Sequence, residues 1–220
     1  MSARDRILAR LTQSAPAVTP DPPDVQRWAR AQRLDESLTQ RIARLCESLE
    51  AAHAETHLTD AGSWRRKLQE IVEAKKLRRL LIGADMELEL TGASPCQLVR
   101  VEQIADHWRD QLFNDIDASL TRVKSAIAAT GTLIVWPDAK EPRLMSLVPP
   151  THLVVLDAAT IHADFSAAIA AENWADHLPA NALLISGPSK TADIQQTMAY
   201  GAHGPRELIV LVVQPEGSGR

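Results

Sequence analysis

Short apolar runs alternate with helix-like segments along most of the second half of this chain. Runs of four to six apolar residues, bounded by glycine, proline or polar residues, are typical of strands buried on both faces of a sheet. They predict strands over residues 77–82, 132–136, 153–156, 182–185 and 208–213. Because helix-like segments separate the runs, we expect an α/β domain built in layers.

Helical spacing is strongest before the first of these strands. Leu38, Ile42, Leu45 and Leu49 recur every three to four residues and predict a helix from about residue 35. The same criterion predicts further helices over residues 62–74, 101–113 and 165–178. The apolar stripe of each helix is expected to face the core.

The N-terminal segment has a different character. Residues 3–11 predict a short amphipathic helix with Ile7, Leu8 and Leu11 on one side. Residues 14–23 contain four prolines and predict an extended linker. We therefore expect an N-terminal helix and proline-rich arm over residues 1–30 and one α/β domain over residues 31–220. Such an arm suits contact with a partner or exchange within a dimer, and a frayed terminus gives the same sequence pattern.

The loop after the strand at 182–185 has the strongest candidate chemistry. Gly187 lets the backbone approach a ligand closely. Ser189, Lys190 and Thr191 precede a segment, 193–200, that is predicted to be a helix. Free N–H groups at a helix start, together with the lysine charge, favour an anion. The alternative interpretation is that the hydroxyl groups only cap the helix.

A strand–helix–strand unit over residues 182–213 predicts a parallel crossover, and ligands bind at the carboxyl ends of strands in such units. The second loop of the unit, 201–206, contains His203 and Arg206. The arginine is able to hold a carboxylate with two hydrogen bonds, and the histidine is able to move a proton near neutral pH. In the alternative interpretation, His203 bonds a backbone carbonyl and Arg206 lies in water.

A third turn is expected to line the same crevice. It precedes the strand predicted at 132–136 and offers backbone amides and two hydroxyl groups. The sequence therefore predicts a site for a small carboxylate or phosphate. Its predicted ligand-binding residues are Thr130, Gly131, Thr132, Gly187, Ser189, Lys190, Thr191, His203 and Arg206.

These motifs resemble those of a known family. Ile185-Ser-Gly-Pro-Ser-Lys-Thr-Ala-Asp193, followed by Gly201-Ala-His-Gly-Pro-Arg206, resembles the C-terminal signature of the LUD-domain lactate-utilisation protein C (LutC/YkgG) family. Residues 126–133 and 147–156 resemble two further blocks of that family. The resemblance implies a three-layer α/β/α sandwich of the sugar-isomerase and CoA-transferase type. It also implies a part in oxidising lactate to pyruvate beside iron–sulfur redox subunits.

One position departs from the family pattern. Members of the family commonly carry glutamate in the block where this chain has Ala129. A carboxylate there would be a natural general base or nucleophile, so no catalytic residue is predicted. We expect an accessory or binding subunit of a lactate oxidation system. The alternative is a stand-alone isomerase or acyl/CoA transferase acting on a small anionic metabolite, for which Lys190 is the candidate group.

Composition and charge narrow the class of protein. Hydrophobic residues make up 45% and charged residues 24% of the 220, which is ordinary for a globular domain. The net charge of −4 argues against a general nucleic-acid binder. No apolar run reaches the roughly 18 residues of a membrane span, and the N-terminus lacks the apolar stretch of a secretory signal. We therefore expect a cytoplasmic protein.

The sequence predicts no resident metal or cofactor. Iron–sulfur clusters are usually held by four thiolates, and this chain has Cys46 and Cys96 alone. Any clusters are therefore expected on partner proteins. His53 and His57 have the spacing of a helical metal pair but lack a third ligand. The expected ligand is a small organic acid or phosphorylated metabolite, and a homo-oligomer is left open.

Overall fold

The computed structural model divides the chain into two units, Met1–Arg33 and Leu34–Arg220. Together they describe residues 2–14, 21, 24, 27, 35–91, 95–104, 108–192, 198–200 and 203–215.

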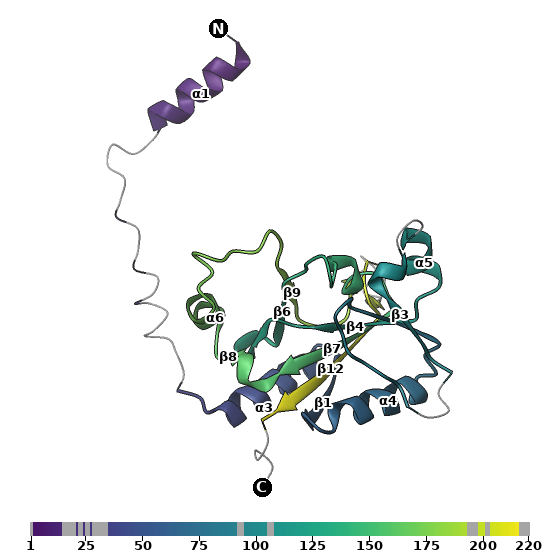
Figure 1. The fold of residues 1–220 in the computed structure, drawn as a ribbon. Helices are drawn as coiled ribbons and strands as arrows, with labels where there is room; N and C mark the ends of the chain where they lie inside the picture. The colour runs from purple at the N-terminus through teal and green to yellow at the C-terminus, as the bar shows by residue number, and fades with distance from the viewer. Residues whose placement is uncertain are drawn as a thin grey trace. The chain divides into compact units, whose positions relative to one another are not determined.

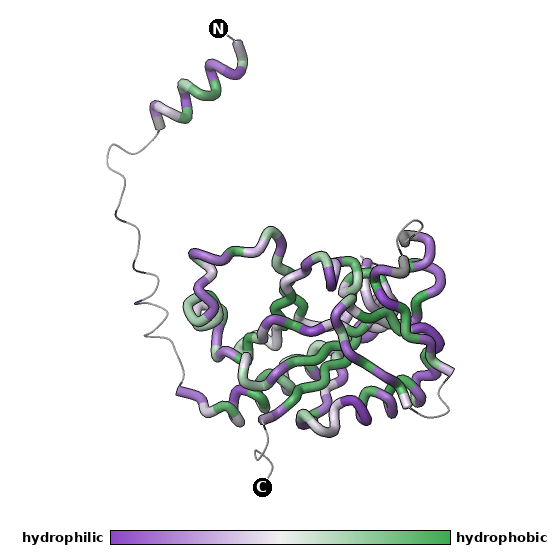
Figure 2. Tube along the Cα trace, viewed as in Figure 1, coloured by the Kyte–Doolittle hydropathy of each residue, from purple (hydrophilic) through white to green (hydrophobic). Residues whose placement is uncertain are grey.

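The first unit contains the helix α1 (Ala3–Ser14), which confirms the helix predicted over residues 3–11. Ser2 and Asp5 cap its start, because the Asp5 amide donates to Ser2 Oγ (3.2 Å) and the Ser2 amide donates to Asp5 Oδ2 (2.9 Å). Ile7, Leu8 and Leu11 are 50–62% exposed. Apolar and polar residues alternate along this helix (Figure 2).

A parallel sheet forms the centre of the second unit (Figure 1). Its strand order is β1–β12–β7–β4–β2–β3, and every neighbouring pair is parallel. In that order the strands are Glu55–Asp60, Glu207–Gln214, Thr151–Asp157, Ala118–Arg122, Arg79–Ile82 and Gln97–Arg100. The most apolar segments of the unit gather in these strands (Figure 2), as expected of a parallel sheet that is covered on both faces.

A smaller sheet has the order β8–β5–β6–β9. β5 pairs in parallel with β8, whereas β6 is antiparallel to both β5 and β9. The strands are β8 (Ile161–His162), β5 (Ser125–Ile127), β6 (Thr132–Val135) and β9 (Leu183–Ile185). A separate antiparallel pair joins β10 (Lys190–Ala192) to β11 (Met198–Tyr200).

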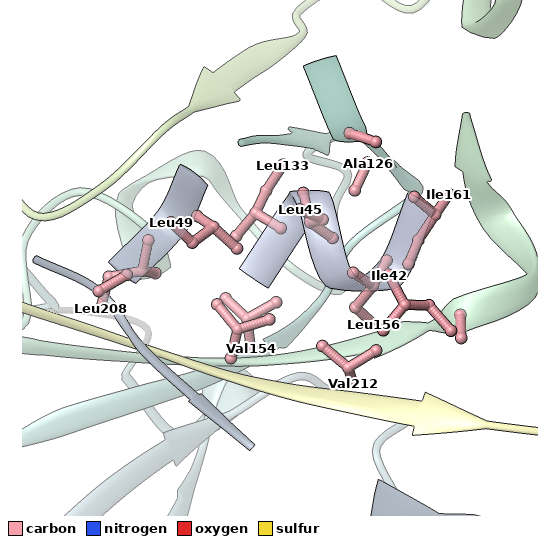
Figure 3. Packing of buried hydrophobic residues seen from close by; sticks show 14 residues of the cluster. Ile42, Leu45, Leu49, Ala126, Leu133, Val154, Leu156, Ile161, Leu208 and Val212 are labelled. Carbon is pink, nitrogen blue, oxygen red and sulfur yellow. The ribbon is translucent and has the colours of Figure 1, made fainter. Parts of the chain in front are cut away.

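The helix α3 (Leu38–Ala51) lies between the two sheets (Figure 3). Its start is fixed by a capping box, in which the Gln40 amide donates to Ser37 Oγ (3.3 Å) and the Ser37 amide donates to Gln40 Oε1 (2.8 Å). Ile42, Leu45 and Leu49 are buried and pack against apolar residues of both sheets. The spacing of these residues in the sequence predicted this helix.

The helix α4 (Trp64–Ala74) covers the opposite face of the central sheet. Successive side chains of a strand point to opposite faces. In β12, Leu208, Val210 and Val212 pack in the cluster of α3, whereas Ile209 and Leu211 pack in the cluster of α4. The predicted three-layer α/β/α class is therefore confirmed, with the smaller sheet added outside α3.

Within the described residues of the second unit, the remaining helices are short. Two are α-helices, α5 (Trp108–Asn114) and α6 (Phe165–Ala171). Four are 3₁₀ turns: η1 (Val101–Ile104), η2 (Ala128–Thr130), η3 (Arg143–Met145) and η4 (Ala158–Thr160). The helix predicted over residues 165–178 was therefore too long. The helix predicted over residues 101–113 coincides with η1 and α5, and residues 105–107 between them lie outside the described part of the chain. No helix within the described ranges has both the length and the apolar character needed to cross a bilayer.

The predicted parallel crossover over residues 182–213 is wrong. β9 belongs to the smaller sheet and β12 to the central sheet, so the two strands are not neighbours. Residues 198–200 form β11 rather than the end of a helix, and residues 193–197 of that predicted helix lie outside the described residues.

The strand β1 was missed by the sequence analysis. It occupies an edge of the central sheet, and its polar sequence, Glu-Thr-His-Leu-Thr-Asp, has no apolar run. His53 and His57, whose spacing would suit a metal pair on a helix, do not lie on a helix. His53 lies in a turn with a φ of 70°, and His57 belongs to β1, where its Nε2 is 2.7 Å from Glu55 Oε1.

Candidate functional site

The two loops singled out by the sequence lie against each other. The Ser189 amide donates a hydrogen bond to the Pro205 carbonyl (2.8 Å). A Cβ atom on Gly204 would lie 3.0 Å from Ser189 Cβ, so glycine permits this close approach. The residues after β9 and those before β12 therefore meet although the predicted crossover between them is absent.

A cavity of about 220 Å³ lies between these loops and the central sheet. Its wall includes side chains that are able to form hydrogen bonds together with apolar residues from the ends of β9 and β12. The hydrogen-bonding residues are Ser146, His152, Ser186, Ser189 and His203. This combination is typical of a site for a small polar ligand.

The cavity lies at the amino edge of the central sheet. His152 and Leu208, which line it, are the second residues of β7 and β12. The sequence analysis expected the site at the carboxyl edge of a parallel crossover. The difference arises because β9, whose carboxyl end leads into the cavity, belongs to the smaller sheet.

Hydroxyl groups connect the turn at 130–132 to the cavity. Thr130 Oγ1 lies 2.7 Å from Thr132 Oγ1, which lies 2.8 Å from Ser186 Oγ. Ser186 lines the cavity, whereas the two threonines stand behind it. The turn therefore contributes a chain of hydrogen-bonded hydroxyl groups that holds the Ser186 side chain in place.

Gly131 and Gly187, both predicted to bind the ligand, allow their loops to pack closely against α3 and its C-terminal residue Ala52. Gly131 has a φ of +60°, and a Cβ atom there would lie 2.6 Å from Ser48 Cβ. Gly187 has a φ of +150°, and its Cβ would lie 3.0 Å from both Cβ and O of Ala52. Gly187 also lines the cavity. Both positions therefore combine a backbone conformation that favours glycine with contact to a helix.

The predicted cations lie beside the cavity rather than in its wall. Lys190 is exposed and begins β10, paired with Tyr200. Thr191 follows it in the same strand. Arg206 is exposed, and its amide donates to the Pro150 carbonyl (2.7 Å). Since Lys190 and Thr191 lie in a strand, they do not form the helix start on which the predicted anion site was based.

His152 is a cavity residue that the sequence analysis missed. Its side chain is fully buried, and its Nε2 lies 2.8 Å from Thr121 Oγ1. Its Nδ1 has no hydrogen-bond partner within the described part of the chain. Burial lowers the pKa of His152 to about 3, so the ring is neutral at physiological pH. The available signal was a histidine in a strand that is otherwise apolar.

A buried nitrogen without a partner calls for an explanation. Leaving such a group unsatisfied costs about 1–3 kcal/mol, and most buried polar groups in proteins are paired. Because His152 lies in the cavity wall, a water molecule or a ligand held in the cavity would supply the missing partner.

A second titratable group lies at the opposite edge of the sheet. Glu141 packs against Gly83, which follows β2, and its Oε2 accepts the amide hydrogen of Arg122 at the end of β4 (3.0 Å). Burial raises the pKa of Glu141 to about 7. The carboxyl group is therefore partly protonated near neutral pH.

A larger groove of about 890 Å³ runs along α4. Its wall has charged residues of both signs, including Arg65, Glu70 and Glu87. Several of its polar groups bind one another: the Thr91 amide donates to Gln69 Oε1 (3.2 Å), and Gln69 Nε2 donates to Glu73 Oε1 (3.0 Å). We therefore favour the smaller cavity as the ligand site.

The position that departs from the family pattern is part of an apolar cluster. The Ala129 amide donates to the Ala163 carbonyl (3.0 Å), and the Ala129 methyl packs with Ile127, Ile134 and Trp174. Among the described residues, no group of three or more histidine, cysteine, aspartate or glutamate side chains is placed to hold a metal ion.

The layered fold and the loop cavity define a class, and comparison with known proteins identifies it. Residues 42–213 match the LUD domain, and the chain therefore belongs to the LUD domain family. It is 35% identical to an uncharacterized protein of Neisseria meningitidis serogroup B, over 98% of this chain and 95% of that protein.

Relatives whose names state a role are more distant in sequence. The chain is 22% identical to lactate utilization protein C 1 of Bacillus mycoides, with 97% of each protein covered. It is 21% identical to lactate utilization protein C of Halalkalibacterium halodurans, with 82% of each covered. The crystal structure of a DUF162 family protein from Deinococcus radiodurans superposes with a TM-score of 0.60 and 22% identity, covering 81% of this chain and 99% of that one. This last likeness supports the fold alone.

Proposed function

We propose that the protein is a cytoplasmic accessory subunit of L-lactate oxidation that binds a small organic acid in the loop cavity. The observation that carries the proposal is its similarity, along nearly the whole chain, to a protein named lactate utilization protein C 1. Membership of the LUD domain family agrees with this role.

The chemistry of the cavity supports a small acid as the ligand. A volume of about 220 Å³ suits a molecule of few atoms, and hydroxyl and imidazole groups line its wall. Lys190, at the start of β10, and Arg206, just before β12, lie beside it and are exposed, so their charges would attract an anion toward it.

An accessory role, rather than independent catalysis, follows from the residues that are present. Ala129 replaces the glutamate that would supply a base or a nucleophile. Two cysteines cannot provide the four thiolates that usually hold an iron–sulfur cluster. We therefore assign electron transfer to iron–sulfur partner proteins, with this chain presenting or sensing the acid.

The test is growth of a strain that lacks the gene. We expect the deletion to prevent growth on L-lactate and to leave growth on pyruvate unchanged. The wild-type gene should restore growth, and Gly204→Val, which places a side chain between the two loops, should not. Ser166→Ala, on α6 and away from the cavity wall, is the matched control and should restore growth fully.

Two results would contradict the proposal. One is normal growth of the deletion strain on L-lactate. The other is turnover of an anionic metabolite by the purified chain without partners, which would favour the isomerase or transferase alternative. Accumulation of both variants in the cell should be measured by immunoblot, so that loss of growth is not confused with loss of protein.

A further inference from the structure

One ring nitrogen of His152 has no hydrogen-bond partner among the described residues. The side chain is 0% exposed, and its Nε2 is occupied by Thr121 Oγ1 at 2.8 Å. Its Nδ1 is buried and has no partner in the described ranges. A neighbouring polar group on the same sheet already has a hydrogen-bond partner, since Ser119 Oγ donates to the Met145 carbonyl (2.5 Å). The free Nδ1 therefore distinguishes His152 from the groups around it.

The surroundings of His152 indicate what this nitrogen meets. The residue lies in the wall of the 220 Å³ cavity, with Ser186, Ser189 and His203 in the same wall. The ring itself is buried, and the turn beside it runs from exposed His203 through Gly204 to buried Pro205. The hydrogen bond from the Ser189 amide to the Pro205 carbonyl holds this turn to the facing loop.

We propose that His152 is a ligand-binding residue of the cavity and that its Nδ1 forms a hydrogen bond with an uncharged oxygen of the bound acid. This inference rests on the proposed function and adds the group that recognises the acid. It makes the ligand an anion with a hydroxyl group beside its charged group.

The choice of an uncharged oxygen follows from the state of the ring. Because burial holds the pKa of His152 near 3, the ring carries no positive charge to attract a carboxylate. If Thr121 donates to Nε2, Nδ1 carries the hydrogen and donates; if Nε2 donates to Thr121, Nδ1 accepts. A hydroxyl group pairs with either tautomer, whereas a carboxylate pairs with only one.

The experiment compares two acids that differ by one hydroxyl group, L-lactate and propionate. In the full chain labelled with ¹⁵N at histidine, L-lactate should change the Nδ1 resonance of His152, and propionate should leave it unchanged. By calorimetry, His152→Phe should weaken L-lactate binding about tenfold, or about 1.4 kcal/mol. It should leave propionate binding within about twofold of wild type. His177→Phe, at an exposed position outside the cavity wall, is the control and should bind both acids like wild type.

The outcomes separate this inference from the proposed function. If both acids bind but the Nδ1 resonance does not respond to saturating L-lactate, the inference is overturned and the proposed function stands. Equal weakening of both acids by His152→Phe would also overturn it, because that result indicates a structural role. If neither acid binds the folded wild type at millimolar concentration, the acid-binding part of the proposed function fails together with the inference. The resonance measurement uses the wild type and does not depend on the folding of the variant.

Discussion

Replacing the buried carboxyl of Glu141 tests the electrostatics of the fold quantitatively. Its pKa is raised from 4.5 to about 7, chiefly because burial penalises the charged form. The amide of Arg122 and the Arg122 charge oppose this shift, whereas Asp85 and Asp138 add to it. Since the native state holds the proton more tightly than the unfolded chain, Glu141 contributes most stability below pH 4.5. That contribution is lost as the pH rises through 7.

The size of the effect follows from the two pKa values. A difference of about 2.5 pH units corresponds to about 3.4 kcal/mol when the loss is complete. By pH 5 the unfolded chain is already largely ionised, so about 2.5 kcal/mol of this remains to be lost between pH 5 and pH 8. Glu141→Gln keeps the side-chain shape and an acceptor for the Arg122 amide but cannot ionise.

Urea unfolding at half-unit steps from pH 5 to pH 8 provides the measurement. The free energy of unfolding of the variant, minus that of wild type, should rise by about 2.5 kcal/mol over this range. Other titrating groups are common to both proteins and cancel in the difference. Glu47→Gln, at an exposed position on α3, controls for the loss of one charge and should give a nearly flat difference. Parallel curves for Glu141→Gln and wild type would refute the reasoning.

Three further substitutions test the packing. Gly131→Ala should lower the free energy of unfolding by about 2–4 kcal/mol, because φ is +60° and the new Cβ would lie 2.6 Å from Ser48 Cβ. Gly62→Ala, whose nearest contact would be 3.4 Å away, should cost less than about 1 kcal/mol, and similar losses for both would contradict the packing described. Leu45→Ala should cost about 3–5 kcal/mol in urea unfolding, and a loss below about 1 kcal/mol would show that α3 is not held between the sheets. Ser37→Ala should cost about 1 kcal/mol in urea unfolding through loss of the capping box, whereas exposed Thr39→Ala should change stability by about half of that or less in the same assay.

The parts of the fold governed by local patterns were predictable. Apolar spacing identified α3, and apolar runs identified β2, β6, β7, β9 and β12. These signals depend on residues near one another in the chain, where side-chain periodicity directly reflects burial.

Pairing between distant segments was less predictable. β9 was assigned to a crossover with β12 because the two runs are adjacent in sequence, but β9 pairs with β6. β1 was missed because an edge strand with one polar side lacks an apolar run. In each case the decisive contact joins residues far apart in the chain.

The candidate site, too, was only partly predictable from the sequence. The meeting of the two late loops was expected from their motifs, and the Ser189–Pro205 hydrogen bond places them together. His152 was not expected, because its role depends on the unpaired Nδ1 and on the cavity beside it. Neither feature exists until β7 and β12 lie side by side.

Titration of the ¹⁵N-labelled protein with L-lactate, followed by backbone amide resonances, tests the central claim most directly. The account predicts saturable changes at Ser186, Ser189 and Gly204, which line the cavity, with smaller changes along α4. Changes confined to the groove around Arg65 and Glu87, or no saturable change at all, would contradict it.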